Sequence, residues 1–144
     1  MDSKKKRKLP CSGNELVDWH FRRLIYILEN KVDKIFVTHG PLRHPDKKRK
    51  RLTGFAYLFD VDCGKIHRSI IFVSGDKKQL PDKTVAAMTL THELLHVLLP
   101  VPEKDILRLE NILWKYFTQE QKNLIKSYLP KHTIRKQPDE IIEE

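Results

Sequence analysis

The amino-acid sequence predicts an α+β domain in which one helix precedes three strands and further helices follow them. Two observations support this class. Apolar residues recur at helical spacing near both ends of the chain, and short β-branched and aromatic runs are grouped between them instead of alternating with helices. The chain has 144 residues, of which 40% are hydrophobic, enough for one domain with a real core.

The first predicted helix runs from Asn14 to about Asn30, with Asn14 as its N-cap. Apolar residues recur there every three or four positions, at Val17, Phe21, Leu24, Ile25 and Leu28. A short strand is predicted over Lys34–His39, because the segment is rich in β-branched and aromatic residues and is followed by Gly40 and Pro41. A polar loop then extends to Arg51.

Two more strands are predicted over Thr53–Phe59 and Ile66–Val73. The residues between them include aspartate and glycine, which favour a hairpin turn. We therefore expect a small antiparallel sheet of three strands.

The second half of the chain is predicted to be helical. Asp82, after a proline, caps a helix that ends at about Leu99, before two further prolines. Glu103 begins an antiparallel helix, and Thr118 with Gln121 has the spacing of a capping box for a last helix that ends at Pro130. The predicted organisation is a flexible basic arm (1–12), one domain (13–130) and a polar, frayed C-terminal tail (131–144).

One motif indicates chemistry: His92-Glu93-Leu94-Leu95-His96, in the middle of the predicted helix. Residues four apart lie on one face of a helix, so both imidazoles can hold one zinc ion at about 2.0–2.1 Å. Glu93 is then placed to act as general base on a water molecule activated by the zinc. We predict His92 and His96 as zinc ligands and Glu93 as the catalytic base; the alternative is a pair of structural histidines.

A catalytic zinc usually has three protein ligands, so one more is expected. The longer pattern H-E-x-x-H-x-x-G-x-x-H is excluded, because leucine and proline occupy its glycine and third-histidine positions. The next helix supplies three acids, and Asp105 is the first choice because it lies level with His96 in an antiparallel pair. Asp105 also shares a predicted inward stripe with the apolar residues Leu109, Ile112 and Tyr116. Glu110 and Glu103 remain alternatives.

The segment Thr91–His96, followed by apolar residues, Pro100 and Glu103–Leu109, resembles the small SprT-like and ImmA/IrrE-type zincins, many of which are phage-associated. The similarity spans about residues 53–117 and is specific at the motif but loose elsewhere. It implies a minimal zincin-like domain, in which a helix packs on a small antiparallel sheet, with one zinc ion and a peptidase mechanism.

Carried over to this chain, the resemblance makes His92 and His96 the zinc ligands and Glu93 the base. The family's third ligand is commonly glutamate, and Asp105 falls nearest to it. The resemblance also implies that Ile66–Val73 is the edge strand with which an extended peptide pairs.

Positive charge is concentrated in two segments. The chain carries 28 Lys and Arg against 19 Asp and Glu, a net charge of +9. Residues 1–10 hold five bases and one acid, and residues 43–51 hold six bases and one acid, so these segments account for the whole excess. The run Lys47, Lys48, Arg49, Lys50 and Arg51 is a candidate for non-specific phosphate contacts; the alternative is a solvated arm and loop.

The leading hypothesis is a monomeric zinc metallopeptidase that acts on a protein or peptide substrate, including one associated with DNA. The alternative is a non-enzymatic nucleic-acid-binding module with a structural or vestigial zinc site. His39 and His67 are weaker candidates for a fourth ligand or an oxyanion donor. The sequence has no membrane-length apolar run and no secretory signal, so we expect an intracellular, cytoplasmic protein, or a nuclear one in a eukaryotic host.

Overall fold

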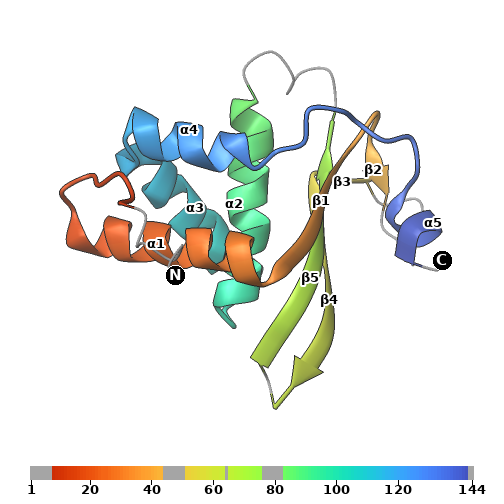
Figure 1. Ribbon diagram of the computed structural model, residues 1–144, viewed down its shortest axis with the longest axis horizontal. Coiled ribbons are helices and arrows are strands. Elements are labelled where there is room, and N and C mark those ends of the chain that lie inside the picture. Colours follow the sequence, from red (N-terminus) through yellow and green to blue (C-terminus); the bar gives the residue numbers. More distant parts are fainter. Residues whose placement is uncertain (1–7, 44–50, 64, 76–82, 143–144) are drawn as a thin grey trace.

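The computed structural model describes residues 8–43, 51–63, 65–75 and 83–142, and it confirms the α+β class. The helices are α1 (Glu15–Asn30), α2 (Thr84–Leu98), α3 (Glu103–Tyr116), α4 (Gln119–Ser127) and α5 (Pro138–Ile142). The strands are β1 (Val32–Thr38), β2 (Leu42–Arg43), β3 (Arg51–Leu52), β4 (Gly54–Asp62) and β5 (Lys65–Ser74). Helix α2 stands between the main sheet and helices α1, α3 and α4 (Figure 1).

The main sheet has the strand order β1-β5-β4, and its three strands are not all antiparallel as the sequence predicted. β4 and β5 form the expected antiparallel hairpin, but β1 pairs with β5 in parallel. The chain between β1 and β5, which includes β4, is long enough for this, since parallel neighbours need a crossover of about a dozen residues or more. β5 is therefore the central strand, as its continuous apolar run Ile70–Val73 suits.

This order corrects the expectation that Ile66–Val73 is an edge strand. Both edges of β5 are paired, whereas β4 pairs with no strand other than β5 among the described residues. The free edge beside the motif helix is that of β4.

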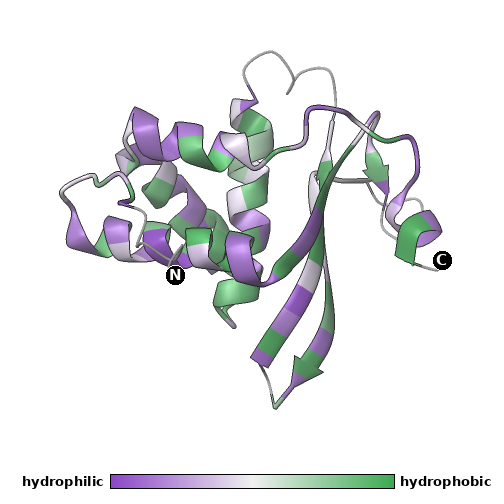
Figure 2. Ribbon diagram, in the orientation of Figure 1, coloured by the Kyte–Doolittle hydropathy of each residue, from purple (hydrophilic) through white to green (hydrophobic). Residues whose placement is uncertain are grey.

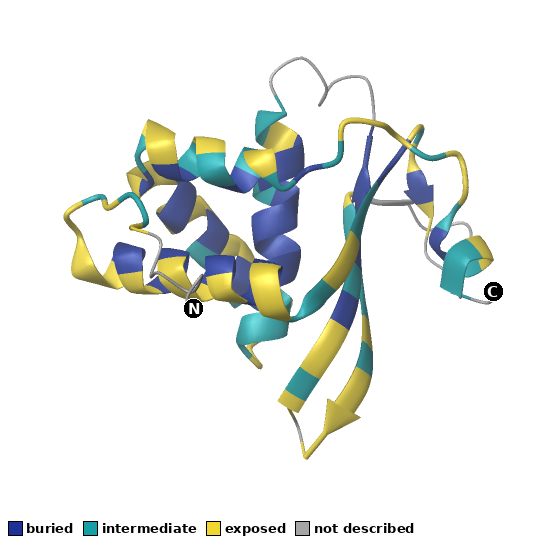
Figure 3. Ribbon diagram, in the orientation of Figure 1, coloured by how far each residue is buried: buried dark blue, intermediate teal, exposed yellow. Residues whose placement is uncertain are grey.

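The hydrophobic core lies between the sheet and the helices. Val37, Ile71 and Val73 of the sheet face it, and they pack with the buried faces of α1, α2, α3 and α4. The buried residues of α1 follow the predicted spacing, and the Asn14 side chain accepts hydrogen bonds from Leu16 N and Val17 N. Hydrophilic and hydrophobic residues alternate around α1 and α3 (Figure 2), while α2 is buried along most of its length (Figure 3).

Helix α2 begins later than the sequence predicted. Its N-cap is Lys83, in a left-handed conformation with φ 60° and without a side-chain capping bond. Asp82, the predicted cap, lies outside the described residues. By contrast, the predicted capping box at the start of α4 is present, with Thr118 and Gln121 bonding reciprocally.

The two terminal segments are more ordered than predicted. In the described part of the arm, Leu9 packs against the core, and Ser12 donates to the buried carboxylate of Asp18 through its N–H and its hydroxyl, both at 2.8 Å. At the other end, Ile134 forms a parallel bridge with Thr38, and α5 follows it. Within the described residues 131–142, this bridge and α5 replace the frayed tail that the sequence predicted. Within the described residues, no helix combines the length and apolar character that crossing a membrane requires.

Two consecutive buried hydrogen bonds connect α3 to α2. The indole N–H of Trp114 donates to Thr91 Oγ1 at 3.0 Å, and that hydroxyl donates to the carbonyl of Ala87 at 2.9 Å. Trp114 and Thr91 are both buried, so each polar group depends on this partner.

Replacing Thr91 with valine keeps the side-chain shape but removes the acceptor for the Trp114 indole. We expect Thr91→Val to lower the free energy of unfolding by about 1–3 kcal/mol, the usual cost of a buried polar group left without a partner. Urea denaturation measures this, with the exposed Thr53→Val as the matched control. Equal midpoints for the two variants would contradict the argument.

Candidate metal centre

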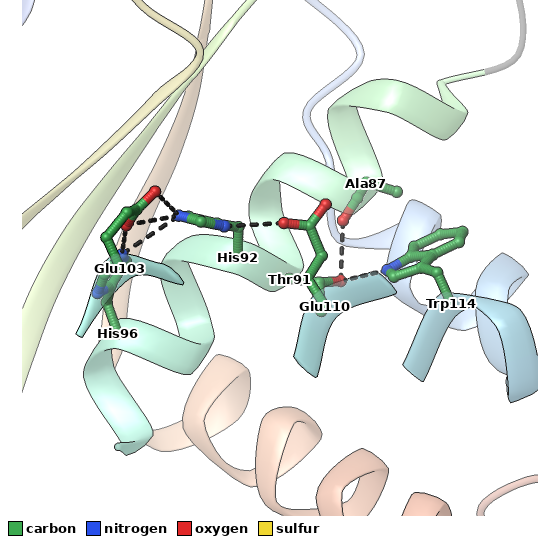
Figure 4. Close-up of polar contacts among 7 residues, drawn as sticks. All are labelled: Ala87, Thr91, His92, His96, Glu103, Glu110 and Trp114. Carbon is green, nitrogen blue, oxygen red and sulfur yellow. Dashed lines mark hydrogen bonds and ion pairs between the residues drawn. The ribbon is translucent and has the colours of Figure 1, made fainter. Parts of the chain in front are cut away.

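Three side chains from α2 and α3 form a group that could hold a metal ion: His92, His96 and Glu103. Their donor atoms all lie within 4.8 Å of one another. His92 and His96 come from successive turns of α2, and Glu103 is the first residue of α3 (Figure 4). This is the group that the H-E-x-x-H spacing predicts, completed by an acid from the next helix.

The distances suit a single small cation. The Nε2 atoms of His92 and His96 are 3.2 Å apart. Glu103 Oε1 lies 3.1 Å from His92 Nε2 and 2.6 Å from His96 Nε2. In a tetrahedral zinc site with ligand bonds of about 2.0–2.1 Å, the donor atoms lie about 3.3 Å from one another. The distances between the two histidine nitrogens and between His92 Nε2 and Glu103 Oε1 match this value, and the distance between His96 Nε2 and Glu103 Oε1 is shorter. Two imidazoles and one carboxylate are also the donor types of known three-ligand zinc sites.

Asp105, the first choice from the sequence, is not in this group, and Glu103 takes its place. The inward face of α3 carries Ile106, Glu110, Leu113 and Trp114, whereas Ile112 and Tyr116 are about half exposed. The predicted inward-facing stripe of α3 was therefore wrong, because the buried face of the helix is rotated about the helix axis from the predicted one. Asp105 lies about 200° around the helix from Glu103, because each residue turns the chain by about 100°.

Glu110 contacts the His92 ring on the side that faces away from Glu103. It follows Glu103 by two helical turns and so shares its face of α3. Its Oε1 lies 2.8 Å from His92 Nδ1, the ring nitrogen opposite the one that faces Glu103 (Figure 4). This contact orients the imidazole, as a carboxylate behind a ligating histidine does. The sequence suggested Glu110 only as a ligand, although its seven-residue spacing from Glu103 indicated a shared face.

The charge state of His92 is set mainly by Glu110. The hydrogen bond from the His92 ring to Glu110 outweighs burial and raises the pKa of His92 to about 9, with Glu93 and Glu103 adding to the effect. The imidazole is therefore protonated at neutral pH in the metal-free protein. Binding of a cation must displace that proton.

Glu93 is buried, with 8% of its surface exposed, and has no hydrogen-bond partner among the described residues. Burial raises the pKa of Glu93 to about 7; His92 opposes this rise, while Glu103 and Glu110 add to it. A carboxyl group with a pKa near neutrality can both accept and release a proton at neutral pH.

Gly54, the first residue of β4, lies directly against the side chain of Glu93. A Cβ atom placed on Gly54 would lie 2.6 Å from Thr89 Cγ2 and 2.9 Å from Glu93 Oε2, too close for either to stay in place. Glycine at this position therefore lets the end of β4 approach the motif helix. Gly54 is not among the site residues predicted from the sequence, although a glycine at the start of a strand was an available signal.

The other candidate residues lie elsewhere. Neither His39 nor His67 belongs to the metal group formed by the described residues. Lys47–Lys50 lie outside the described residues, and only the backbone of Arg51 is described, within β3. The structure therefore brings together the motif residues with Glu103 and Glu110.

Comparisons of the chain with protein-family models, with curated proteins and with solved structures found no match.

From the composition of the candidate metal group, we expect alanine substitutions at three acidic residues to affect metal binding differently. Glu103→Ala removes a donor, so we expect loss of bound zinc after dialysis. Glu110→Ala leaves the donors but frees the His92 ring, so we expect about 10–100-fold weaker binding. Asp105→Ala should retain full stoichiometry. Metal analysis and competition with a chelator measure these values; zinc loss confined to Asp105→Ala would overturn the assignment.

The raised pKa values predict how the stability of the metal-free protein depends on pH. His92 stabilises the fold below its unfolded pKa of 6.5, and this contribution is lost as pH rises through about 9. Glu93 acts in the same direction, because burial penalises its charge as pH rises from 4.5 through about 7. We expect the Tm in a chelator to fall by about 5 °C between pH 6 and pH 9.5.

His92→Gln is the control for this pH dependence, since it removes the principal titrating group. Its Tm should vary less over the same range, as differential scanning fluorimetry can measure. A Tm that rises with pH in the metal-free wild-type protein would contradict the assignment. Zinc should stabilise the wild-type protein more at higher pH, because the ligands are then deprotonated.

Proposed function

We propose that the protein is a zinc-dependent metallopeptidase that hydrolyses peptide bonds of a protein substrate, with Glu93 as general base. The observation that carries the proposal is the buried carboxylate of Glu93, with a pKa of about 7, next to the donor group His92, His96 and Glu103. Among the described residues, three donors and not four converge, a pattern typical of catalytic rather than structural zinc sites.

A bound zinc ion would supply a Lewis acid that lowers the pKa of a water molecule and polarises the scissile carbonyl. His92, His96 and Glu103 would hold the ion. Glu110 keeps the His92 ring oriented from its far side, so that the ring does not have to be ordered when the ion binds.

Glu93 moves the proton in the proposed reaction. Its carboxylate accepts a proton as the water attacks the carbonyl carbon, and then delivers that proton to the nitrogen of the leaving amine when the C–N bond breaks. A pKa of about 7 lets the same group perform both steps at neutral pH. No described residue holds the Glu93 carboxylate by a hydrogen bond, so neither of its oxygens is committed to a described protein partner.

The free edge of β4 is the proposed place for the substrate backbone. β4 starts at Gly54 against Glu93, and only its β5 side is paired among the described residues. An extended peptide can add to such an edge by main-chain hydrogen bonds, which gives affinity with little dependence on sequence. We therefore propose β4 as the edge strand that pairs with the substrate, in place of Ile66–Val73, to which the resemblance to the zincin families assigned this role.

The substitution Glu93→Gln tests the proposal, because it keeps the shape of the side chain but removes the base. We expect unchanged zinc stoichiometry and at least about a 100-fold loss of cleavage of an unfolded protein such as reduced casein, in line with the usual contribution of a general base. The exposed substitution Glu120→Gln is the matched control and should retain full activity.

The outcomes separate the two functions considered from the sequence. Equal cleavage by Glu93→Gln and wild type would overturn the role of Glu93. A zinc-loaded wild-type protein without cleavage of any unfolded substrate would instead favour a non-enzymatic module with a structural metal.

A further inference from the structure

A cavity lies away from the candidate metal centre, where β2 meets the C-terminal segment. Its volume is about 400 Å³, and its lining residues are His39, Gly40, Pro41, Arg43, Arg135 and Gln137. None of them belongs to α2 or α3. Figure 1 shows the C-terminal segment passing over the sheet and ending with α5 beside β2.

Backbone and side-chain hydrogen bonds hold the walls of this cavity in place. His39 N donates to the carbonyl of Ile134 at 2.6 Å, and Ile134 N donates to the carbonyl of Val37 at 2.8 Å. Gln137 joins the other wall, since its Oε1 accepts from Arg43 N at 2.9 Å and its Nε2 donates to the carbonyl of Pro41 at 3.2 Å. The cavity is therefore built by tertiary contacts between distant segments.

Among the residues that the structure describes, the lining is cationic and contains no acidic residue. Arg43 and Arg135 are exposed, and neither guanidinium forms an ion pair with a described residue. The nearby carboxylate of Glu140 accepts a hydrogen bond from Gln137 N at 2.9 Å. Two unpaired guanidinium groups at one cavity favour an anion with several oxygens, because each fork can donate two parallel hydrogen bonds.

We propose that this cavity binds phosphodiester groups of a nucleic-acid backbone. Arg43 lines the cavity and is also the first of the six bases that residues 43–51 contain, so the sequence that follows it is strongly basic and favours a polyanion over a single phosphate. The described lining residues include no Phe, Tyr or Trp on which a base could stack, so the proposed contact is with the nucleic-acid backbone and is independent of base sequence. The inference does not depend on the proposed zinc chemistry.

Binding of a fluorescein-labelled DNA duplex to the full chain, measured by anisotropy, tests this proposal. We expect the double variant Arg43→Ala/Arg135→Ala to bind about tenfold more weakly and to lower the slope of log Kd against log salt by about 1 to 2, as loss of one or two phosphate contacts predicts. The matched control is Arg22→Ala/Arg108→Ala, which removes the same charge from exposed positions of α1 and α3.

A second variant probes the cavity without removing an arginine. A Cβ on Gly40 would meet no atom within 4 Å, so Gly40→Glu can place a carboxylate in the lining without a clash. We expect it to weaken DNA binding at least as much as the double arginine variant, with an unchanged Tm. Gly40→Gln is its neutral control and should bind nearly as wild type does.

Four outcomes would overturn the proposal: no DNA binding by the wild type, equal weakening by the Arg22 and Arg108 control, unchanged binding by Gly40→Glu, or binding of inorganic phosphate or phosphatidylglycerol vesicles in place of DNA. Each of these measurements is separate from peptide cleavage, so the two proposals can fail independently.

Discussion

The packing of α3 against α2 is the constraint on which the candidate site depends. Along α3, Glu103, Glu110 and Trp114 contact successively earlier parts of α2, namely His96 with His92, then His92, then Thr91. The two helices therefore run in opposite directions, and the short connection through residues 99–102 sets their register. The Trp114–Thr91 bond and the buried apolar face of α3 hold this register, and Glu103 reaches the histidines only because they do.

The site also concentrates ionisable groups at the boundary between the core and the surface, since Glu103 and His96 are partly exposed to solvent. Glu93, Glu103 and Glu110 surround two histidines, and Glu93, Glu110 and His92 are buried. Burial of so many ionisable groups costs free energy unless they are paired, and the pairing here is unequal. Glu110 bonds His92 and Glu103 contacts both rings, whereas Glu93 has no hydrogen-bond partner among the described residues. A divalent cation would offset much of this negative charge, so stability and metal binding are coupled.

The two candidate sites arise from different kinds of structure. The candidate metal group is formed by two helices adjacent in sequence, and the glycine at the start of β4 lies against the neighbouring Glu93. The cationic cavity is formed by the end of β1, β2 and a C-terminal segment that the sheet captures through Ile134. The charge pattern agrees with this separation, because the excess of bases lies in two short segments and the remainder of the chain is balanced.

The sequence by itself determined the features that depend on neighbouring residues: the helix caps at Asn14 and Thr118, the β4–β5 hairpin, and the pair His92 and His96 one turn apart. Only the tertiary structure decided the parallel pairing of β1 with β5, the capture of the C-terminal segment, and the choice of Glu103 over Asp105. The reason is physical. Caps, turns and i,i+4 spacing are governed by local backbone geometry, whereas strand order and the rotation of one helix against another depend on how distant apolar surfaces pack, and a rotation of α3 by one residue exchanges the side chains that face the site.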